Sequence, residues 1–481
     1  MVDSQHVDVL IVGAGLSGIG AACQLKMACP TKTFVILEGR EAMGGTWDLF
    51  RYPGVRSDSD MYTLGYRFRP WRDAKAIADG PAILNYIRDT AKEFHVDEKI
   101  CYDHKVSRAS WSSEEARWAV EAETDQGVAN FTCSFLYLCT GYYDYENGYT
   151  PDWPDVDKFR GEIIHPQKWP ENFDYTGKRV VIIGSGATAV TLVPAMAESA
   201  EHVTMLQRSP TYIVSMPTED AIANFLRRHL PDGASYAFAR WKNVIRQMFF
   251  YGLSRRRPET MKRLINKGIR TELGEDYDLK HFTPPYDPWD QRLCLVPDSN
   301  LFKVIRKGRA SIVTDTIERF TASGIQLGSG EHLDADIIVT ATGLNLKLLA
   351  GLQLVVDGDP VDLSKTMAYK GMMYSDVPNA ASAFGYTNAS WTLKCDLTAE
   401  YVCRILNYMD QNGFVQCTPR RNDPELKEER VLDFTSGYVQ RALHTLPSQG
   451  SKTPWKLHQN YVKDLSMLRY GKVDDGTMEF K

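Results

Sequence analysis

The sequence predicts an α/β protein with two Rossmann-like domains and a helical insert. Two strand–loop–helix units carry glycine-rich turns, DVLIVGAGLSGIGAACQL near the N-terminus and RVVIIGSGATAVTLVPAMA further along the chain. Residues 216–290 break the alternation of strands and helices and place apolar residues at three- and four-residue intervals. The 481 residues exceed the roughly 250–300 at which a single hydrophobic core stops growing, so two or three domains are expected.

Composition and charge exclude several classes of protein. Hydrophobic residues make up 43% of the chain and charged residues 24%, which is ordinary for a globular protein. The net charge of −5 argues against a nucleic-acid partner. We find no apolar run long enough for a bilayer, no basic region of a secretory signal, no CxxC pair and no metal-ligand spacing. A reduced, cytoplasmic protein without a metal site is therefore expected.

The first glycine loop predicts a dinucleotide site. Gly13, Gly15 and Gly18 have the GxGxxG spacing, which allows a tight turn, close approach of the backbone to a pyrophosphate and close packing of the helix. Ser17 lies in the same loop. The next apolar strand ends at Glu38, about twenty residues past the loop, where a carboxylate can accept hydrogen bonds from ribose hydroxyls. A glycine-rich turn alone is weak support, but the two features together favour dinucleotide binding.

The second glycine loop predicts a site for NADPH. Gly184 and Gly186 repeat the fingerprint, with Ala189 at a third position where alanine is allowed. The next strand ends in Gln-Arg-Ser instead of an acid. Arg208 in this tripeptide can bind a 2′-phosphate bidentately, whereas a carboxylate would repel it; a surface arginine at a strand end is the alternative. The other residues assigned to this site are Ser185, Ala187, Thr188 and Ser209.

Two dinucleotide sites in one chain indicate electron transfer from NADPH to a flavin. The apolar segments 135–143 and 335–344 both contain Thr-Gly at the strand end, and each is expected to bring backbone to one dinucleotide. The turn in EAMGGTWDLFRYPGVRSDSD allows another close approach to the flavin, although an ordinary turn before a core Trp is the alternative. The further residues assigned to the flavin site are Gly45, Thr46, Trp47, Asp48 and Val106.

The segment FRGEIIHPQKWP, between the two loops, carries a specific resemblance. It fits the FxGxxxHxxxW(P/D) fingerprint of type I Baeyer–Villiger monooxygenases at Phe159, Gly161, His165, Trp169 and Pro170. Related flavin-containing and N-hydroxylating monooxygenases share both loops but usually lack the Trp-Pro ending. The resemblance covers almost the whole chain, and segments such as GGTWDLFRYPGVRSDSDMYTLGYRFRPW and DPWDQRLCLVPDSNLF look particularly like the ethionamide-activating subgroup.

The resemblance implies an active-site arginine with a carboxylate partner. Arg292 in WDQRLC matches that arginine, and Asp58 matches the acid that orients it beside flavin and nicotinamide. A fixed guanidinium stabilises the negative charge that develops when a peroxide attacks a ketone, and it does not deprotonate. The neighbouring loop residues Arg56 and Ser57 are assigned to NADPH, with a solvated charged loop as the alternative. Gln291 stands where the family commonly has a Lys, which puts one expected phosphate contact in question.

The implied activity is that of an NADPH- and O₂-dependent flavin monooxygenase with FAD. A C4a-peroxyflavin is expected to insert one oxygen next to the carbonyl of a small ketone, giving an ester or lactone, and to oxygenate sulfides or thioamides as well. A monooxygenase restricted to S or N atoms, and a flavin- and NADPH-binding sensor without turnover, remain alternatives. His165 lacks metal partners and is interpreted as part of an interdomain joint that couples domain movement to the flavin, with direct proton transfer as the alternative.

The helical insert suggests a further partner. FLRRHL, FARWKNVIRQMFFYGL and ETMKRLINKGIRTEL are expected to be helices, and the resemblance places them over the active site. Between Arg227 and Arg270 there are twelve Lys or Arg against two acids, Asp232 and Glu259. This excess can favour an anionic lipid surface, so peripheral membrane contact is a hypothesis, with a solvated helical face as the alternative.

Residues 385–393 are a candidate wall of the active-site pocket through Asn388 and Trp391, with core packing as the alternative for Trp391.

The motifs also predict the order of the domains along the chain. The expected segments are 1–145 and 345–481 for a discontinuous FAD domain, 146–215 and 291–344 for an interrupted NADPH domain, and 216–290 for the insert.

Overall fold

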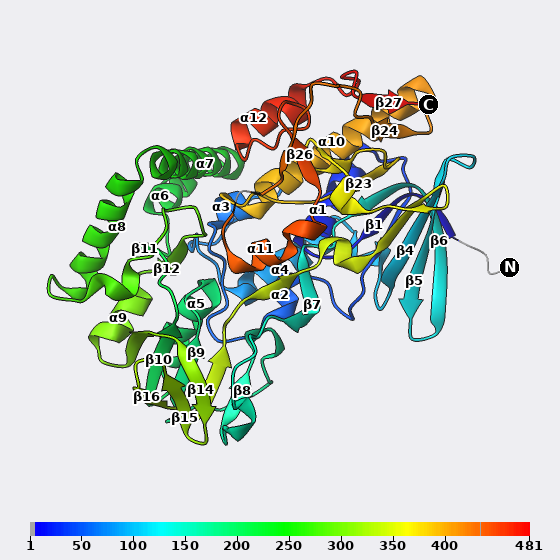
Figure 1. Ribbon diagram of the computed structural model, residues 1–481. Helices are drawn as coiled ribbons and strands as arrows, with labels where there is room; N and C mark the ends of the chain where they lie inside the picture. The colour runs from blue at the N-terminus through cyan, green and yellow to red at the C-terminus, as the bar shows by residue number, and fades with distance from the viewer. Residues whose placement is uncertain (1–4, 433) are drawn as a thin grey trace.

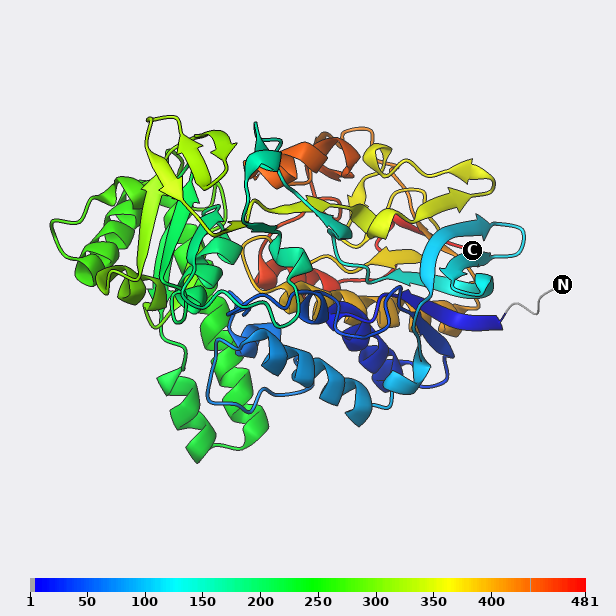
Figure 2. The same ribbon diagram turned by 90° about the horizontal axis from the view of Figure 1, so that it is seen from below.

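The computed structural model describes residues 5–432 and 434–481 as two α/β domains with a helical projection (Figure 1). The first domain contains strands from both ends of the described chain, and the second domain is inserted between them. Seen from below, the second domain lies to the left of the first, and two green helices project from the body of the molecule (Figure 2).

The first domain is built on a nine-stranded sheet in which parallel strands bring their carboxyl ends to one edge. Strand β1 pairs in parallel with β2 and β6, with Val12 beside Leu37 and Leu138. The strand order is β20-β19-β4-β5-β6-β1-β2-β3, and β23 also pairs with β6. The bounds are β1 (Gln5–Val12), β2 (Phe34–Leu37), β3 (Ile100–Cys101), β4 (Lys105–Ser112), β5 (Arg117–Thr124), β6 (Gly127–Leu138), β19 (Gln353–Val356), β20 (Asp359–Pro360) and β23 (Ala380–Ser382).

Both faces of β1 are buried, which explains its continuous apolar sequence. Val9 and Ile11 belong to the core that the helices cover, whereas Leu10 and Val12 belong to the core on the opposite face. Successive side chains alternate in this way because a strand has a period of two. The helices of this domain are α1 (Leu16–Ala28), α2 (Thr46–Leu49), α3 (Met61–Leu64), α4 (Gly80–Glu93) and α10 (Trp391–Asn412).

The second domain has a five-stranded parallel sheet in the order β13-β10-β9-β17-β8. Helix α5 packs against it, and its side chains Ala189, Val190, Leu192, Val193 and Met196 are buried there. The bounds are β8 (Glu162–Ile164), β9 (Arg179–Ile183), α5 (Ala187–Met196), β10 (His202–Gln207), β11 (Ile213–Met216), β12 (Cys294–Pro297), α9 (Asn300–Arg306), β13 (Ala310–Thr314), β14 (Ile317–Thr321), β15 (Gly324–Leu327), β16 (His332–Asp334) and β17 (Ile337–Thr340).

Two antiparallel strands connect the domains. The chain enters the second domain through β7 (Tyr143–Gly148) and leaves it through β18 (Leu344–Leu346), and the two strands pair with each other. The chain after β18 returns to the first domain through short elements. These are β21 (Ala368–Tyr369), β22 (Met373–Tyr374), β24 (Cys417–Pro419), β25 (Glu428–Arg430), α11 (Gly437–Ala442), β26 (Ser448–Gly450), α12 (Tyr461–Leu465) and β27 (Met478–Phe480).

The insert consists of three helices that contact both domains. They are α6 (Ala221–His229), α7 (Asp232–Arg256) and α8 (Pro258–Leu273). Helix α7 packs on α3 of the first domain, and α8 packs on β11 and α9 of the second. Helices α6 and α7 begin earlier than the apolar pattern predicts, because Asp220 caps α6 through the Ala223 N–H and Tyr236 in the first turns of α7 is buried. Within residues 5–432 and 434–481, no helix is long and apolar enough to cross a membrane.

Candidate active site

The first glycine loop fits a pyrophosphate. Gly13 has φ +102°, and a Cβ there would come within 2.7 Å of the Cys139 carbonyl oxygen. A Cβ on Gly18 would lie 1.8 Å from the Gly13 oxygen, so only glycine lets α1 pack this closely. Gly15 is the N-cap of α1, where no side chain caps the helix and the first turn has no acid. The free N–H groups and positive end of the helix are therefore available to phosphate oxygens.

Glu38 is held next to this loop at the end of β2. Its buried carboxylate accepts hydrogen bonds from the N–H of Ala14 at 2.7 Å and the N–H of Arg40 at 3.1 Å. Burial raises the pKa of Glu38, and these hydrogen bonds oppose that rise. The two backbone donors fix the carboxylate in the position where the sequence predicts a ribose partner.

The turn at Gly44-Gly45, where the sequence predicts a contact with the flavin, faces the first loop. Gly45 has φ +55°, and a Cβ there would lie 3.1 Å from the Cα of Gly15. The Thr46 and Tyr145 hydroxyls are 3.4 Å apart. Trp47 is partly buried against the core of the first domain, and Val106 is a core residue at the start of β4.

The Asp48 side chain has partners that sequence analysis did not identify. Its buried carboxylate forms ion pairs with Arg40 at 2.7 Å, Arg88 at 3.3 Å and Arg51 at 3.7 Å. Its oxygens therefore face guanidinium groups, which leaves the backbone of Asp48 as the part available to a flavin.

An aromatic cluster adjoins the first loop. The Ser17 hydroxyl accepts a hydrogen bond from the Trp391 indole N–H at 2.9 Å. The Trp391 ring stacks on Tyr142 with a centroid distance of 4.8 Å and lies 5.3 Å from Phe384. Trp391 thus contacts residues next to the loop rather than only the core. Tyr142 follows directly after the Thr140-Gly141 strand end, a position that sequence analysis singled out without naming the ring.

The second glycine loop leaves open space at the start of α5. Gly184 has φ +136°, and a Cβ there would come within 2.3 Å of the Ala341 oxygen. Gly186 is an N-cap without a side-chain partner, the first turn has no acid, and a Cβ on Gly186 would meet nothing within 4 Å. This geometry also fits a pyrophosphate. Ala189 is fully buried, as the third position of the fingerprint requires for close packing.

The polar residues of the second glycine loop lie near the start of α5. The Ser185 hydroxyl donates to the Ser209 carbonyl oxygen at 2.9 Å, and Tyr52 hydrogen-bonds the Thr188 side chain from the first domain. Arg208 is exposed just past β10 and forms no ion pair with any residue that the structure describes. Its guanidinium is therefore free to meet a phosphate group.

Arg56 and Ser57 are engaged within the protein. The Arg56 guanidinium donates to the Thr191 hydroxyl on α5 and, at 2.5 Å, to the Leu295 carbonyl oxygen on β12. The buried Ser57 hydroxyl donates to the Ser59 carbonyl oxygen at 2.8 Å and accepts the Ser59 N–H at 2.9 Å. The Ser57 hydroxyl proton could reach NADPH only by exchange of its hydrogen bond to Ser59, whereas the buried Nε of Arg56 has no hydrogen-bond partner in the described structure.

Asp58 and Arg292 line one cavity of about 680 Å³ between the two domains and the insert. Asp58 comes from the first domain and Arg292 from the segment before β12. Burial raises the pKa of Asp58, and Arg292 and Arg56 oppose that rise. Burial lowers the pKa of Arg292, but Asp58 and the nearby tyrosines outweigh it, so the net pKa lies above the usual range. The guanidinium therefore remains charged while it faces open space in the cavity.

The remaining walls of this cavity are mostly apolar. They come from β11, β12, α7 and α8, with Asn388 from the predicted pocket wall on the opposite side. Apolar walls exclude water and strengthen the electrostatic effect of a charge. Examples are Ile213, Met216, Phe250, Leu264, Ile265 and Leu293. No group of three or more His, Cys, Asp or Glu side chains suited to a metal occurs among residues 5–432 and 434–481.

His165 lies where the two connecting strands join the second domain. Its Nε2 is 3.3 Å from the Gly343 carbonyl oxygen, next to β18. Its ring also covers Gly148 at the end of β7, where an added Cβ would come within 2.0 Å of the ring. Burial lowers the pKa of His165, which favours the neutral imidazole. The ring contacts the joint and does not line the cavity that contains Arg292.

The two glycine loops and the strand order define a protein with two Rossmann-like domains, and Asp58 and Arg292 line one cavity. Comparison with known families identifies its class. The family described as flavin-binding monooxygenase-like matches residues 73–349, and the NAD(P)-binding Rossmann-like domain matches residues 11–75. The chain belongs to the flavin-binding monooxygenase-like family.

Its similarity to individual relatives extends over nearly the full length. The chain is 56% identical over 479 residues to the FAD-containing monooxygenase EthA of Mycobacterium tuberculosis, covering 99% of this chain and 98% of the relative. It is 50% identical to the probable FAD-binding monooxygenase AlmA of Acinetobacter baylyi, covering 99% and 96%. Among solved structures, an oxidized steroid monooxygenase bound to NADP shares the fold with a TM-score of 0.79 at 22% identity, covering 99% of each chain.

These comparisons confirm the predicted family resemblance and the predicted α/β fold class. They also confirm an FAD-dependent monooxygenase at the level of the family, since the relatives are named FAD-containing and FAD-binding monooxygenases, and the steroid monooxygenase that shares the fold has NADP bound. They do not separate ketone from sulfur oxygenation.

Proposed function

We propose that this chain is an FAD- and NADPH-dependent monooxygenase that inserts one oxygen next to the carbonyl of a small ketone, giving an ester or lactone. The same site is proposed to oxygenate the sulfur of sulfides or thioamides. The observation that carries the proposal is the placement of Asp58 and Arg292 on one largely apolar cavity.

The two glycine loops are proposed to hold the cofactors. The residues proposed for FAD are Gly13, Gly15, Gly18 and Glu38, and those proposed for NADPH are Gly184, Gly186 and Arg208. When bound, the cofactors supply the electrons and, with O₂, the reactive oxygen. The chain positions the substrate, excludes water and stabilises charge.

Arg292 is proposed to stabilise the reaction at the carbonyl. Addition of an oxygen nucleophile to a ketone places negative charge on the carbonyl oxygen, and a fixed guanidinium in an apolar cavity lowers the free energy of that charge. Asp58, on the same cavity, is proposed to orient Arg292, and its negative charge favours the charged guanidinium by raising the pKa of Arg292. Transfer of oxygen to sulfur generates no comparable carbonyl charge, so sulfur oxygenation should depend less on Arg292.

The test follows NADPH oxidation by the holoenzyme with an aliphatic ketone and, separately, a sulfide, with products identified by mass spectrometry. Ester formation supports the proposal. Sulfoxide alone would support the S- or N-oxygenating alternative, and an absence of substrate-stimulated oxidation would support a sensor. Arg292→Ala should retain flavin reduction and lose ester formation, by roughly 10²–10³-fold in rate. As a control, replacement of an exposed arginine, Arg319→Ala, should leave flavin reduction and ester formation unchanged. A normal ester yield in Arg292→Ala would contradict the proposed role of Arg292.

A further inference from the structure

We propose that the surface formed by α6, α7 and α8 docks on an anionic lipid surface and that the cavities open toward it. The proposed docking depends only on the geometry and charge of the insert. The proposal that substrate enters the cavities from the lipid also rests on the proposed function.

Helix α7 is apolar on two opposite sides. Its buried side packs on the first domain through residues such as Tyr236 and Val244. Its other side carries a row of large side chains spaced by three and four residues, which places them on one face. These are Phe238, Trp241, Ile245 and Phe249, with exposed fractions of 54%, 41%, 59% and 63%.

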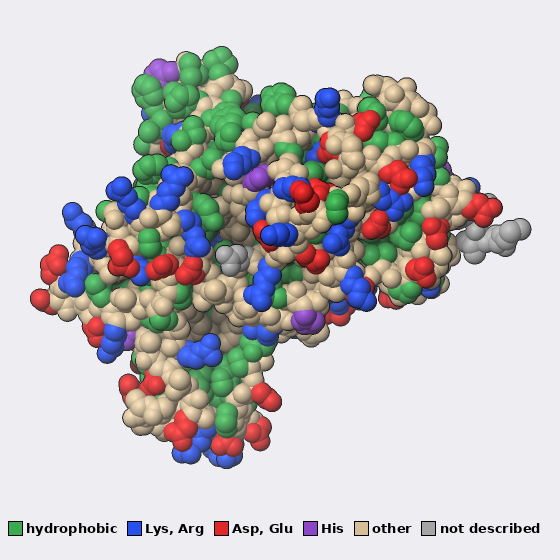
Figure 3. Space-filling model, turned by 45° about the horizontal axis from the view of Figure 1, so that its top comes forward, with side chains coloured by type: hydrophobic (Ala, Val, Ile, Leu, Met, Phe, Trp, Pro, Cys, Tyr) green, Lys and Arg blue, Asp and Glu red, His purple; other side chains and the backbone are tan. Residues whose placement is uncertain are grey.

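The neighbouring helices extend this apolar surface. Of the fifteen large hydrophobic side chains that are exposed in residues 5–432 and 434–481, nine lie in the insert, a concentration that marks an interaction surface. Figure 3 shows hydrophobic side chains gathered on the lobe at upper left, and Figure 2 shows green helices of the insert projecting at the bottom of the view. The nine exposed side chains of the insert are the four of the α7 row together with Ile222, Phe225, Leu230, Phe250 and Leu264.

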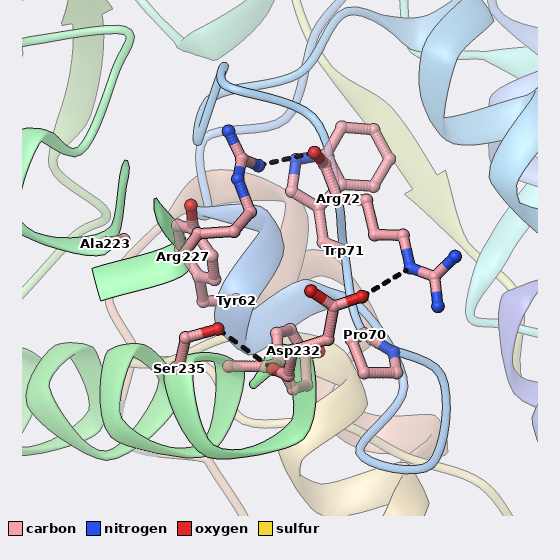
Figure 4. Close-up of a pocket in the computed structure, with 9 residues that line it drawn as sticks. Tyr62, Pro70, Trp71, Arg72, Ala223, Arg227, Asp232 and Ser235 are labelled. Atoms are coloured by element: carbon pink, nitrogen blue, oxygen red, sulfur yellow. Dashed lines mark hydrogen bonds and ion pairs between the residues drawn. The ribbon is translucent and has the colours of Figure 1, made fainter. Parts of the chain in front are cut away.

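The projection is fixed to the body of the protein. Arg227 of α6 donates hydrogen bonds to the carbonyl oxygens of Arg72 and Asp73, the latter at 2.7 Å, and Asp232 of α7 pairs with Arg72 at 3.3 Å (Figure 4). In the middle of α7, Arg240 pairs with the buried Asp396 at 2.9 Å. These contacts attach α6 and α7 to the first domain and fix the orientation of α7. The apolar row therefore stays exposed to solvent.

Charge selects the kind of partner. Basic side chains without an ion pair in the described parts of the chain occur along all three helices, in a protein whose net charge is −5. A second copy of the chain would bring the same positive charges against this surface, whereas phosphate groups of anionic lipids would neutralise them. Examples are Arg228, Arg246, Arg256, Arg257 and Lys267.

The same surface borders the cavities. Phe250 and Leu264 are about half exposed, and both line the 680 Å³ cavity that contains Arg292. Phe249 and Arg256 line an adjoining cavity of about 590 Å³, which shares Gln247 with the larger one. An apolar molecule dissolved in the lipid would therefore meet the mouths of both cavities at the docked surface.

The experiment is co-sedimentation of the FAD-loaded enzyme with phosphatidylcholine vesicles, with and without phosphatidylglycerol, at low salt. We expect binding to the anionic vesicles and at least tenfold weaker binding to neutral ones. Arg228→Glu/Lys267→Glu should weaken anionic binding by roughly tenfold or more, because each basic residue near the surface contributes separately. Phe238→Ser/Ile245→Ser should weaken it as well, whereas Val415→Ser/Tyr470→Ser, exposed residues outside the insert, should not.

Flavin content and thermal melting verify that each variant is folded. Equal binding to both vesicle types, absence of binding, or insensitivity to both insert variants would overturn the proposal. Association of the protein into dimers that Phe238→Ser/Ile245→Ser dissociates would assign the surface to a second copy and overturn it too. Failure of the proposed function would appear instead as absent ester formation from a water-soluble ketone, with vesicle binding intact.

Discussion

His165 hydrogen-bonds the Gly343 carbonyl oxygen across 3.3 Å and covers Gly148, so one side chain contacts the end of β7 and the residue just before β18. Its Nδ1 accepts the Gln167 N–H at 3.2 Å, which assigns the proton to Nε2 and makes the ring a donor to Gly343. Any rotation of the second domain relative to the first must move these strands. The geometry therefore supports the interpretation of His165 as part of a joint.

Gly148→Ala should disturb this joint. The added Cβ would lie 2.0 Å from the His165 ring, so the ring or the strand must move. Because a shift of about 1 Å can cost about 10²-fold in rate, we expect flavin reduction by NADPH to slow by an amount of that order. Anaerobic stopped-flow absorbance measures this rate. Gly233→Ala, whose Cβ meets nothing within 4 Å, is the control, and equal rates in the two variants would contradict the role of the joint.

The joint should also weaken in acid. Burial lowers the pKa of His165 below its ordinary 6.5, so the native protein binds fewer protons here than the unfolded chain. The stabilisation is therefore complete above pH 6.5 and is lost as the pH falls below that value through the native pKa. Melting temperatures of the wild type and His165→Gln should differ most at neutral pH and converge in acid. A difference in melting temperature that grows as the pH falls would contradict a lowered pKa of His165 in the native protein.

Local patterns were sufficient to predict the loops but not their long-range partners. Gly13, Gly18 and Gly184 could be recognised because their spacing follows the fingerprint of a strand–turn–helix unit, although the carbonyl oxygens that Gly13 and Gly184 approach belong to residues distant in the sequence. The ion pairs of Asp48 depend on Arg88, which no local pattern connects to it. For the same reason the sequence did not reveal that Trp391 reaches Ser17.

The insert illustrates a second limit of sequence analysis. The apolar residues of FARWKNVIRQMFFYGL predict a helix, but they surround most of its circumference. Which side is buried depends on α3 and α10, because Arg240 pairs with Asp396 across that interface. The exposure of Ile245 could be recognised only once that packing was known.

Gly15→Ala and Gly186→Ala should separate the two cofactors. A Cβ on Gly15 would lie 3.6 Å from the nearest atom and a Cβ on Gly186 would meet nothing within 4 Å, so both variants should fold. Each methyl group occupies the approach to a helix N-terminus. We expect Gly15→Ala to lose FAD, measured by flavin absorbance per chain. Gly186→Ala should keep FAD and raise the KM for NADPH, and each variant serves as the control for the other. Full FAD content in Gly15→Ala would refute the assignment of the first loop.

Arg208→Ala should lower the preference for NADPH over NADH. The exposed guanidinium has no ion-pair partner in the described structure, and a charge-assisted hydrogen bond to a phosphate contributes about 1.5–3 kcal/mol. The KM for NADPH should therefore rise by roughly 10–100-fold, with little change for NADH. Steady-state kinetics with both coenzymes measure the ratio. Lys307→Ala removes another exposed cation, near the end of α9, and should leave the ratio unchanged, whereas a parallel rise for NADH would exclude a 2′-phosphate contact.

Removal of either partner of the buried Arg240–Asp396 pair should strongly destabilise the protein. The side chains are 5% and 8% exposed, and Arg240 also donates to the carbonyl oxygens of Tyr62 at 2.9 Å and Gly65 at 2.7 Å. Arg240→Met or Asp396→Asn leaves the other charge buried without its partner, which costs about 3–5 kcal/mol in the free energy of unfolding. Denaturant unfolding monitored by circular dichroism measures the loss.

The double variant Arg240→Met/Asp396→Asn should lose less stability than the sum of the single losses, because it leaves no unpaired charge at the interface of α7 with the first domain. Lys452→Met provides the matched control. Lys452 pairs with Asp423 at 2.6 Å, but the two side chains are 47% and 41% exposed, so its loss should cost less than about 1 kcal/mol. Additive losses in the double variant would mean that the two charges do not stabilise each other, and the attachment of α7 would then depend on its apolar side and the backbone hydrogen bonds of Arg240.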